Sequence, residues 1–185
     1  MNSIFQQPWF YHFLESTGFL EPFRFSVKRS GMEVGVIQGF IQKDGGLLKK
    51  FFSRRAIING GPWLAVDITD NELENLLSRC VDGLKRKAIY IETRNFSDYS
   101  RFRPIFEKMG FVYESHYDFL VDTSSHEIVD SRMGKSRKRD VNASIKHGAT
   151  VTYNPTEAEV TAFYQILKDL YQNKVKTPLF SKEYS

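Results

Sequence analysis

Phe106-Glu107-Lys108-Met109-Gly110-Phe111 is the stretch that decides the fold. It ends an apolar pattern of helical period that begins at Ser97, and Gly110 can close that helix because glycine adopts the left-handed conformation without steric cost. Phe111 then starts a run of strand period, with aromatic or branched residues at alternate positions as far as Val121. The stretch therefore predicts a helix over 97–110 followed directly by a closing strand over 111–121.

The sequence upstream of this helix begins with a helix and a meander of strands. An apolar helical face predicts a helix over 6–18. Alternation predicts strands over 23–28 and 34–41, and Arg29-Ser30-Gly31 between them is a turn, so the two strands form a hairpin. A second turn, Asp44-Gly45-Gly46, leads to a third strand over 50–59, which Gly60-Gly61-Pro62 ends.

Two more elements complete the first part of the chain. Thr69 and Glu72 have the spacing of a capping box, and apolar residues follow at helical intervals as far as Leu84. Residues 88–92 then form a short strand. The predicted order is helix, three strands, helix, strand, helix, strand, which gives an α/β domain over 1–122 with a mixed sheet and helices on both faces.

A second domain is predicted over 123–185, and it begins with two helices. Ser124 and Glu127 have the spacing to cap a short helix, which Gly134 interrupts. A basic helix follows over 135–147, and Gly148 ends it.

The rest of this domain contains a brief strand and one strongly amphipathic helix. The strand is predicted over 151–153. Thr156 and Glu159 form a second capping box, and the helix after it places large apolar residues on one stripe. The members of the stripe are Val160, Phe163, Ile166, Leu167, Leu170 and Tyr171. An exposed stripe of this size favours packing on the first domain or, as we prefer, a homodimer through 156–171.

The order of elements and the phrase from Phe106 to Phe111 resemble the GNAT acyltransferases. The continuation resembles Fem-type transferases, which carry two GNAT-like lobes in one chain: a basic helix ends in glycine, as at Gly148, and leads into the first strand of the second lobe. The resemblance implies an N-terminal GNAT-like lobe over 1–122. It also implies a connector helix and the truncated start of a second lobe over 123–185.

One departure from the GNAT pattern concerns coenzyme A. GNAT domains that bind this cofactor hold its pyrophosphate on successive backbone N–H groups at a glycine-rich loop. This sequence offers Asn59-Gly60-Gly61-Pro62-Trp63-Leu64 there, and Pro62 has no N–H to donate. We therefore expect no cofactor on this lobe, and the resemblance places the acyl donor, aminoacyl-tRNA or acyl-CoA, on the second lobe.

The resemblance implies an acyl- or aminoacyl-transferase that forms an amide on an amine acceptor. Known Fem-type members use aminoacyl-tRNA to extend a peptidoglycan precursor peptide. The 185-residue chain alone is expected to be inactive, since the family plan needs a complete second lobe. Two alternatives stay open: a single-lobe N-acetyltransferase that uses acetyl-coenzyme A, and a non-catalytic module that binds RNA or substrate.

Positive charge is concentrated in one segment. Between Ser131 and Gly148, six Lys and Arg residues face one Asp, a net charge of +5, whereas the whole chain carries +4. Such a patch favours a phosphate-bearing partner such as tRNA, and the alternative is a solvated helix face. Helical spacing places Arg132, Lys135 and Arg139 together, so these three are the candidate polyanion-binding residues.

Four residues are candidates for substrate binding, and no catalytic residue can be assigned. Arg54 and Arg55 precede the Gly-Gly loop, where a guanidinium can bind a carboxylate or phosphate. Glu92 and Arg94 lie at the end of a strand, where ligands enter open α/β sheets. Glu92 is a candidate general base, with a Glu92–Arg94 structural pair as the alternative. The four histidines have no metal-ligand spacing, so no metal site is predicted.

The cysteine content and the lack of targeting signals indicate the cytoplasm. The single cysteine, Cys80, excludes an intrachain disulfide, and its place on an apolar helical stripe predicts a buried, inert thiol. The first ten residues lack the pattern of a signal peptide. No apolar run approaches the roughly 18 residues that a membrane span needs.

Overall fold

The computed structural model describes residues 3–43, 53–117, 121–175, 179 and 182. The chain divides into two compact units between Tyr113 and Glu114. Each unit is described by itself. The predicted turn at 44–46 and the predicted start of the third strand at residue 50 lie outside the described residues.

The first unit is built on a mixed, five-stranded sheet with the order β1-β2-β3-β5 and with β4 paired to β2. β1 (Glu21–Arg29) and β2 (Met32–Gln42) form the predicted hairpin, and β3 (Arg55–Gly60) is antiparallel to β2. β5 (Tyr90–Asn95) is parallel to β3, with Arg55 opposite Tyr90 and Gly60 opposite Asn95. Since β3 and β5 are parallel, their carboxyl ends meet at one edge of the sheet.

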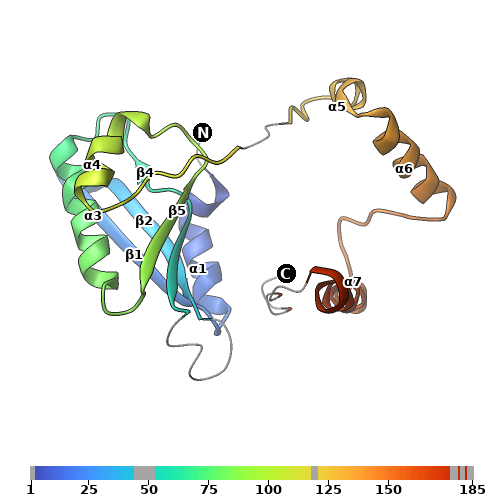
Figure 1. Ribbon diagram of the computed structural model, residues 1–185, viewed down its shortest axis with the longest axis horizontal. Coiled ribbons are helices and arrows are strands. Elements are labelled where there is room, and N and C mark those ends of the chain that lie inside the picture. Colours follow the sequence, from blue (N-terminus) through green and yellow to red (C-terminus); the bar gives the residue numbers. More distant parts are fainter. Residues whose placement is uncertain (1–2, 44–52, 118–120, 176–178, 180–181, 183–185) are drawn as a thin grey trace. The chain divides into compact units, whose positions relative to one another are not determined.

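Helices cover both faces of this sheet (Figure 1). α3 (Asp70–Leu84) makes the crossover between β3 and β5, and α4 (Arg103–Lys108) packs beside it. On the opposite face lies α1 (Pro8–Ser16), whose Phe10 and Leu14 pack on Phe40 and Ile57. A short 3-10 turn, η1 (Ile4–Gln6), leads into α1.

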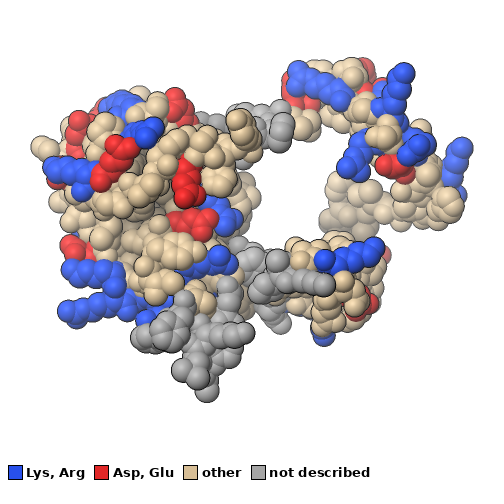
Figure 2. Space-filling model, viewed as in Figure 1, with Lys and Arg blue, Asp and Glu red and all other residues tan. Residues whose placement is uncertain are grey.

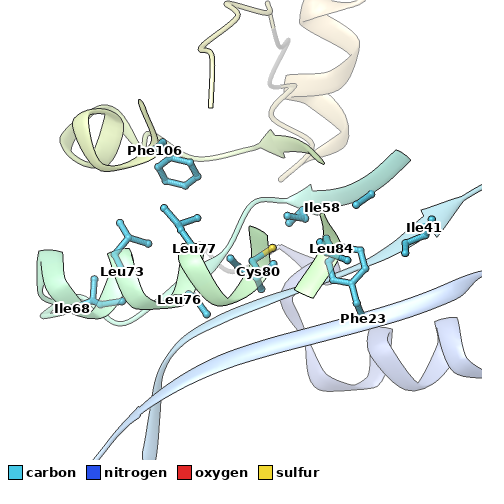
Figure 3. Close-up of a cluster of buried hydrophobic side chains, with 12 residues drawn as sticks. Phe23, Ile41, Ile58, Ile68, Leu73, Leu76, Leu77, Cys80, Leu84 and Phe106 are labelled. Carbon is cyan, nitrogen blue, oxygen red and sulfur yellow. The ribbon is translucent and has the colours of Figure 1, made fainter. Parts of the chain in front are cut away.

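The larger core lies between the sheet and α3 (Figure 3). The predicted apolar stripe of α3 points into it, and its members are at most 1% exposed: Leu73, Leu76, Leu77, Cys80 and Leu84. Each fully buried aliphatic side chain contributes roughly 1.5–3 kcal/mol, so this stripe fixes α3 on the sheet. Burial raises the pKa of the Cys80 thiol to about 12, as expected for an inert cysteine.

The second unit contains three α-helices among its described residues. They are α5 (His126–Arg132), α6 (Lys135–Lys146) and α7 (Glu157–Leu170), and a π-turn, η3 (Tyr171–Val175), continues α7. The capping box of Thr156 and Glu159 is confirmed. The side chain that caps α5 is Ser125, so the prediction of Ser124 was wrong by one residue.

Two predicted strands are wrong. Residues 111–117 and 121 have no strand structure, and neither has the segment 151–153. The alternating pattern was real, but a strand exists only where a neighbouring edge pairs with it. Phe111 instead donates its backbone N–H to the Phe106 carbonyl oxygen, while Gly110 closes α4 at a φ of 88° as predicted.

Other boundaries also moved. The predicted helix over 97–110 is a 3-10 turn, η2 (Ser100–Phe102), followed by α4, since Pro104 fits only the first turn of an α-helix. A two-residue strand, β4 (Trp63–Leu64), was not predicted. Among the described residues, no helix is both long enough and apolar enough to cross a membrane.

Candidate functional site

The candidate site lies at the carboxyl ends of β3 and β5, where open α/β sheets bind ligands. Gly60, Gly61 and Pro62 follow β3, and residues 96–99 follow β5. Gly60 and Gly61 have φ values of 78° and 74°, a conformation that favours glycine. A Cβ atom on Gly61 would lie 2.4 Å from the Asn95 Oδ1, so the close approach of the two loops also requires glycine there.

The carbonyl groups of this loop converge on the side chain of Gln6. Its Nε2 lies 3.0 Å from the Gly60 oxygen, 3.2 Å from the Gly61 oxygen and 3.0 Å from the Pro62 oxygen. Its Oε1 accepts a hydrogen bond from the backbone N–H of Ser3 at 3.0 Å, which fixes the amide with its nitrogen toward the loop. The loop therefore presents acceptors, and one amide group in the same chain supplies the donor.

A second glutamine fastens the turn that carries Gln6. Gln38, only 4% exposed on the central strand β2, donates from Nε2 to the carbonyl oxygens of Phe5 and Gln7 at 2.9 and 2.8 Å. A buried amide donor without a partner would destabilise the fold, so these two hydrogen bonds are retained and hold η1 against the sheet. The position of Gln6 is thus set by the fold and not by a free N-terminal arm.

The carbonyl oxygens of this loop face a donor of the protein itself. A phosphate needs convergent N–H donors, whereas the oxygens of residues 60–62 point at one shared donor. Pro62 adds no donor of its own. The expectation that this lobe holds no coenzyme A stays a prediction, and it rests on the missing N–H of Pro62.

A small depression opens beside the loop, with a volume of about 310 Å³. Its lining includes Gln6, Trp63, Asp98, Tyr99, Arg101 and Phe102. The residues come from η1, β4 and the segment between β5 and α4, so elements far apart in the sequence meet there. The lining combines aromatic rings, an amide, a hydroxyl and one group of each charge.

The hydroxyl of Tyr99 has a fixed polarity. It donates to the Pro62 oxygen at 2.5 Å and accepts a hydrogen bond from the Gln6 Nε2 at 3.3 Å. Burial raises the pKa of Tyr99, so the hydroxyl stays protonated at neutral pH. Because its single proton is used on Pro62, the Tyr99 hydroxyl can act toward a further partner only as an acceptor.

The two charged residues of the lining are held by local contacts. Asp98 accepts the backbone N–H of Ser100 at 2.8 Å, and this hydrogen bond lowers the pKa of Asp98, which stays ionised at neutral pH. Arg101 stacks on the Phe102 ring at 4.7 Å and donates to the Ile68 oxygen at 3.4 Å. Among the described residues, neither side chain forms an ion pair.

The four substrate-binding residues predicted from sequence do not line this depression. Arg55 is the first residue of β3 and Arg54 precedes it, so both lie at the opposite end of the strand from the Gly-Gly loop. Glu92 and Arg94 lie on β5 and form an ion pair, with 2.6 Å between Oε1 and Nε. That pair is the structural alternative considered for Glu92, and binding by the four residues remains a prediction.

The predicted polyanion-binding residues lie in the second unit. Arg132 is the last residue of α5, whereas Lys135 and Arg139 are on α6, so the prediction that helical spacing brings the three together on one helix is wrong: the extended backbone at Met133 separates the two helices. All three side chains are exposed. Figure 2 shows Lys and Arg side chains gathered over these two helices. Lys138, also on α6, forms an ion pair with Asp130, with 2.8 Å between Nζ and Oδ2.

Sequence reasoning missed the residues that form the depression. Gln6, Asp98, Tyr99 and Arg101 were not among the candidate site residues. No sequence signal predicts the contact between Gln6 and Gly60, which lie 54 positions apart. One sequence signal was usable. An Asp often accepts the backbone N–H two residues on and so stabilises a turn, as Asp98 does for Ser100. This turn follows a predicted strand, and ligands often bind beyond the carboxyl ends of strands.

Comparisons with solved structures identify the fold. No protein-family profile and no curated protein matches the sequence. A crystal structure of FemX superposes with a TM-score of 0.59 at 18% identity, over 98% of this chain and 48% of that one. A probable acetyltransferase superposes with a TM-score of 0.40 at 14% identity, over 64% of this chain and 90% of that one. The first of these matches shows that the chain shares the fold of FemX, and the chain spans about half the length of that protein.

Proposed function

We propose that this protein is an acyl- or aminoacyl-transferase that joins an activated acyl group to an amine and forms an amide. The fold supports transfer chemistry of this class. The acceptor is an amine-bearing compound, and the Fem-type resemblance favours a peptidoglycan precursor peptide. The donor is aminoacyl-tRNA or acyl-coenzyme A.

The observation that carries the proposal is the loop at Gly60, Gly61 and Pro62. In this lobe the amide of Gln6 binds the carbonyl groups of the loop, and Pro62 has no N–H to offer a cofactor pyrophosphate. The depression beside it is lined by Asp98 and Tyr99, which suit an amine, and by Arg101, which suits a carboxylate. We assign this lobe to the acceptor and assign the donor to a second GNAT-like lobe that begins within 123–185.

Amide formation of this kind requires the enzyme to position two substrates and does not require a nucleophile from the protein. The unprotonated amine attacks the acyl carbonyl carbon, a tetrahedral oxyanion forms, and the bond to the donor oxygen or sulfur breaks. The amine loses a proton, and the leaving group takes one up. An enzyme that holds both substrates in line and stabilises the oxyanion supplies most of the acceleration, without a catalytic triad.

Mass spectrometry of transfer reactions tests the proposal. The 185-residue chain and the product of the complete reading frame are each incubated with a precursor pentapeptide and with either aminoacyl-tRNA or acetyl-coenzyme A. We expect the pentapeptide to gain one acyl residue with the complete product and none with the 185-residue chain. Absence of any transfer from either donor would overturn the proposal.

Calorimetry with coenzyme A separates this function from that of a single-lobe acetyltransferase. We expect no saturable heat when coenzyme A is titrated into the 185-residue chain, because Pro62 interrupts the row of N–H donors that its pyrophosphate needs. Tight binding that is lost in Gly61→Trp would place the cofactor on the loop and favour the single-lobe N-acetyltransferase instead.

The exposed basic residues of α5 and α6 favour a second role in binding RNA, either as part of tRNA recognition or alone. Filter binding of tRNA across a salt series tests it, because each phosphate contact that is lost reduces the slope. The triple variant Arg132→Glu, Lys135→Glu, Arg139→Glu should lose binding. The matched triple Lys85→Glu, Arg86→Glu, Lys87→Glu changes the net charge equally and should retain it. Equal losses in both would show that only net charge matters.

A further inference from the structure

The depression beside the Gly-Gly loop contains opposite charges that the described residues leave without ion pairs. Asp98 and Arg101 both line it, whereas several other arginines of this unit bind carboxylates. Arg24 pairs with Glu33, Arg29 with Glu72, and Arg103 with Glu107, at 2.6 to 2.7 Å. A pair of opposite charges that do not bind each other is suited to bind a ligand that carries both.

We propose that this depression is a binding site for a zwitterion, a compound with a primary ammonium and a carboxylate, with Asp98 and Tyr99 on the ammonium and Arg101 on the carboxylate. The proposal rests on the proposed function in one point only, that the bound amine is the acceptor. The chemistry is shared by a free amino acid and by the end of a peptide.

The ammonium side is set by two acceptors. Tyr99 uses its proton on the Pro62 oxygen and receives an N–H from Gln6, which leaves one lone pair for a ligand. Asp98 accepts one backbone N–H, from Ser100, and retains further acceptor positions on its carboxylate. An ammonium group, with three N–H donors, satisfies both, and a neutral hydroxyl or carbonyl does not.

The carboxylate side is set by Arg101. The Phe102 ring at 4.7 Å and the Ile68 carbonyl oxygen at 3.4 Å hold the guanidinium from the protein side, and they leave its charge uncompensated. A guanidinium has five N–H donors, and its planar fork matches a carboxylate with two parallel hydrogen bonds. Because the guanidinium is already held in the free protein, less side-chain entropy is lost when a ligand binds.

The size of the depression limits the ligand. A volume of about 310 Å³ lies at the lower end of the roughly 300–1,000 Å³ typical of small-molecule sites. It suits an amino acid or one or two residues of a peptide. A nucleotide or a whole acyl carrier does not fit.

Calorimetric titration of the 185-residue chain tests the site, with no acyl donor present. The probes are L-lysine, the dipeptide alanyl-lysine, cadaverine, which lacks the carboxylate, and diacetyl-lysine, which lacks the ammonium. We expect saturable binding of L-lysine or of the dipeptide, and binding weaker by about tenfold or more for the two compounds that lack a charge. The better of the two zwitterions identifies the source as free amino acid or peptide.

Variants at the two charges complete the test. Asp98→Asn retains the acceptor for Ser100 and so preserves the turn, and Arg101→Gln removes the guanidinium. Each variant should lower the affinity for the zwitterion about tenfold or more, while the matched controls Asp82→Asn and Arg103→Gln should bind it as the parent does. Asp98→Asn should also abolish the preference for L-lysine over diacetyl-lysine.

The outcomes separate this proposal from the proposed function. If no zwitterion binds, or if Asp98→Asn and Arg101→Gln bind as tightly as the parent, the site assignment is wrong even where amide transfer is detected. If zwitterions bind with the expected dependence but no transfer occurs with any donor, the site stands and the transferase assignment fails.

Discussion

Among single residues, Gln6 decides the character of the site. One NH₂ group with two hydrogens lies within 3.3 Å of four oxygens, those of Gly60, Gly61, Pro62 and Tyr99. The same amide thus binds the carbonyl groups of the loop and, by donating to the Tyr99 hydroxyl, directs the proton of that hydroxyl toward Pro62. Loss of Gln6 leaves part-buried acceptors without their donor, which costs more than one ordinary hydrogen bond contributes.

Gln6→Ala should therefore lower the free energy of unfolding by about 1–3 kcal/mol. Gln6→Glu, which keeps the size but replaces the donor with a charged acceptor, should cost more at neutral pH. Urea unfolding followed by tryptophan fluorescence measures both variants. Gln165→Ala is the control, since within the part of the chain that the structure describes that amide bonds only Asp169, on the exposed face of α7. If Gln6→Ala is as stable as the parent, the loop does not depend on this contact.

At the scale of elements, the predictable structures were those specified by nearby residues. The capping boxes at Thr69 and Thr156 and the stripe of α3 are local patterns, and the structure confirms them. Residues 111–121 and 151–153 carry strand patterns, but strand formation depends on a partner that sequence does not reveal. The same reason hid β4, which exists only because Trp63 and Leu64 meet Val36 and Gly35.

The start of α3 carries a pH-dependent interaction. Glu72 caps Thr69 and also binds Arg29, and the Arg29 guanidinium, followed by the Thr69 N–H, lowers the pKa of Glu72 to about 2. A carboxyl whose pKa is lower in the folded state stabilises the fold above its ordinary pKa of 4.5. That contribution is lost as the pH falls from there toward about 2.

Glu72→Gln should accordingly reduce stability at neutral pH and flatten its decline between pH 4.5 and about 2. Urea midpoints at a series of pH values give the slope. Arg29→Gln removes the largest cause of the shift and should flatten the same window, and the double variant should add little to either single change. An unchanged acid slope in Glu72→Gln would contradict this account.

For the whole molecule, the two units differ in what they expose. Positive charge is concentrated between Ser131 and Gly148, where the net charge is +5, so the rest of the chain carries −1. The second unit also exposes the apolar stripe of α7, with Phe163 at 58%, Ile166 at 64% and Leu170 at 40%. Single exposed apolar residues are common, but three on one helical face mark a surface that another element covers.

We predict that two chains associate through residues 156–171. Full burial of one such side chain contributes roughly 1.5–3 kcal/mol, so three from each chain are enough to offset the entropy lost on association at micromolar concentrations. Sedimentation velocity should show a dimer for the parent and a monomer for Ile166→Asp. Ala158→Asp is the control: it adds the same charge on the opposite face of α7, in the first turn where an acid is favourable, and should remain dimeric. If the parent is monomeric across the concentration series, the stripe does not join two copies and another segment must cover it.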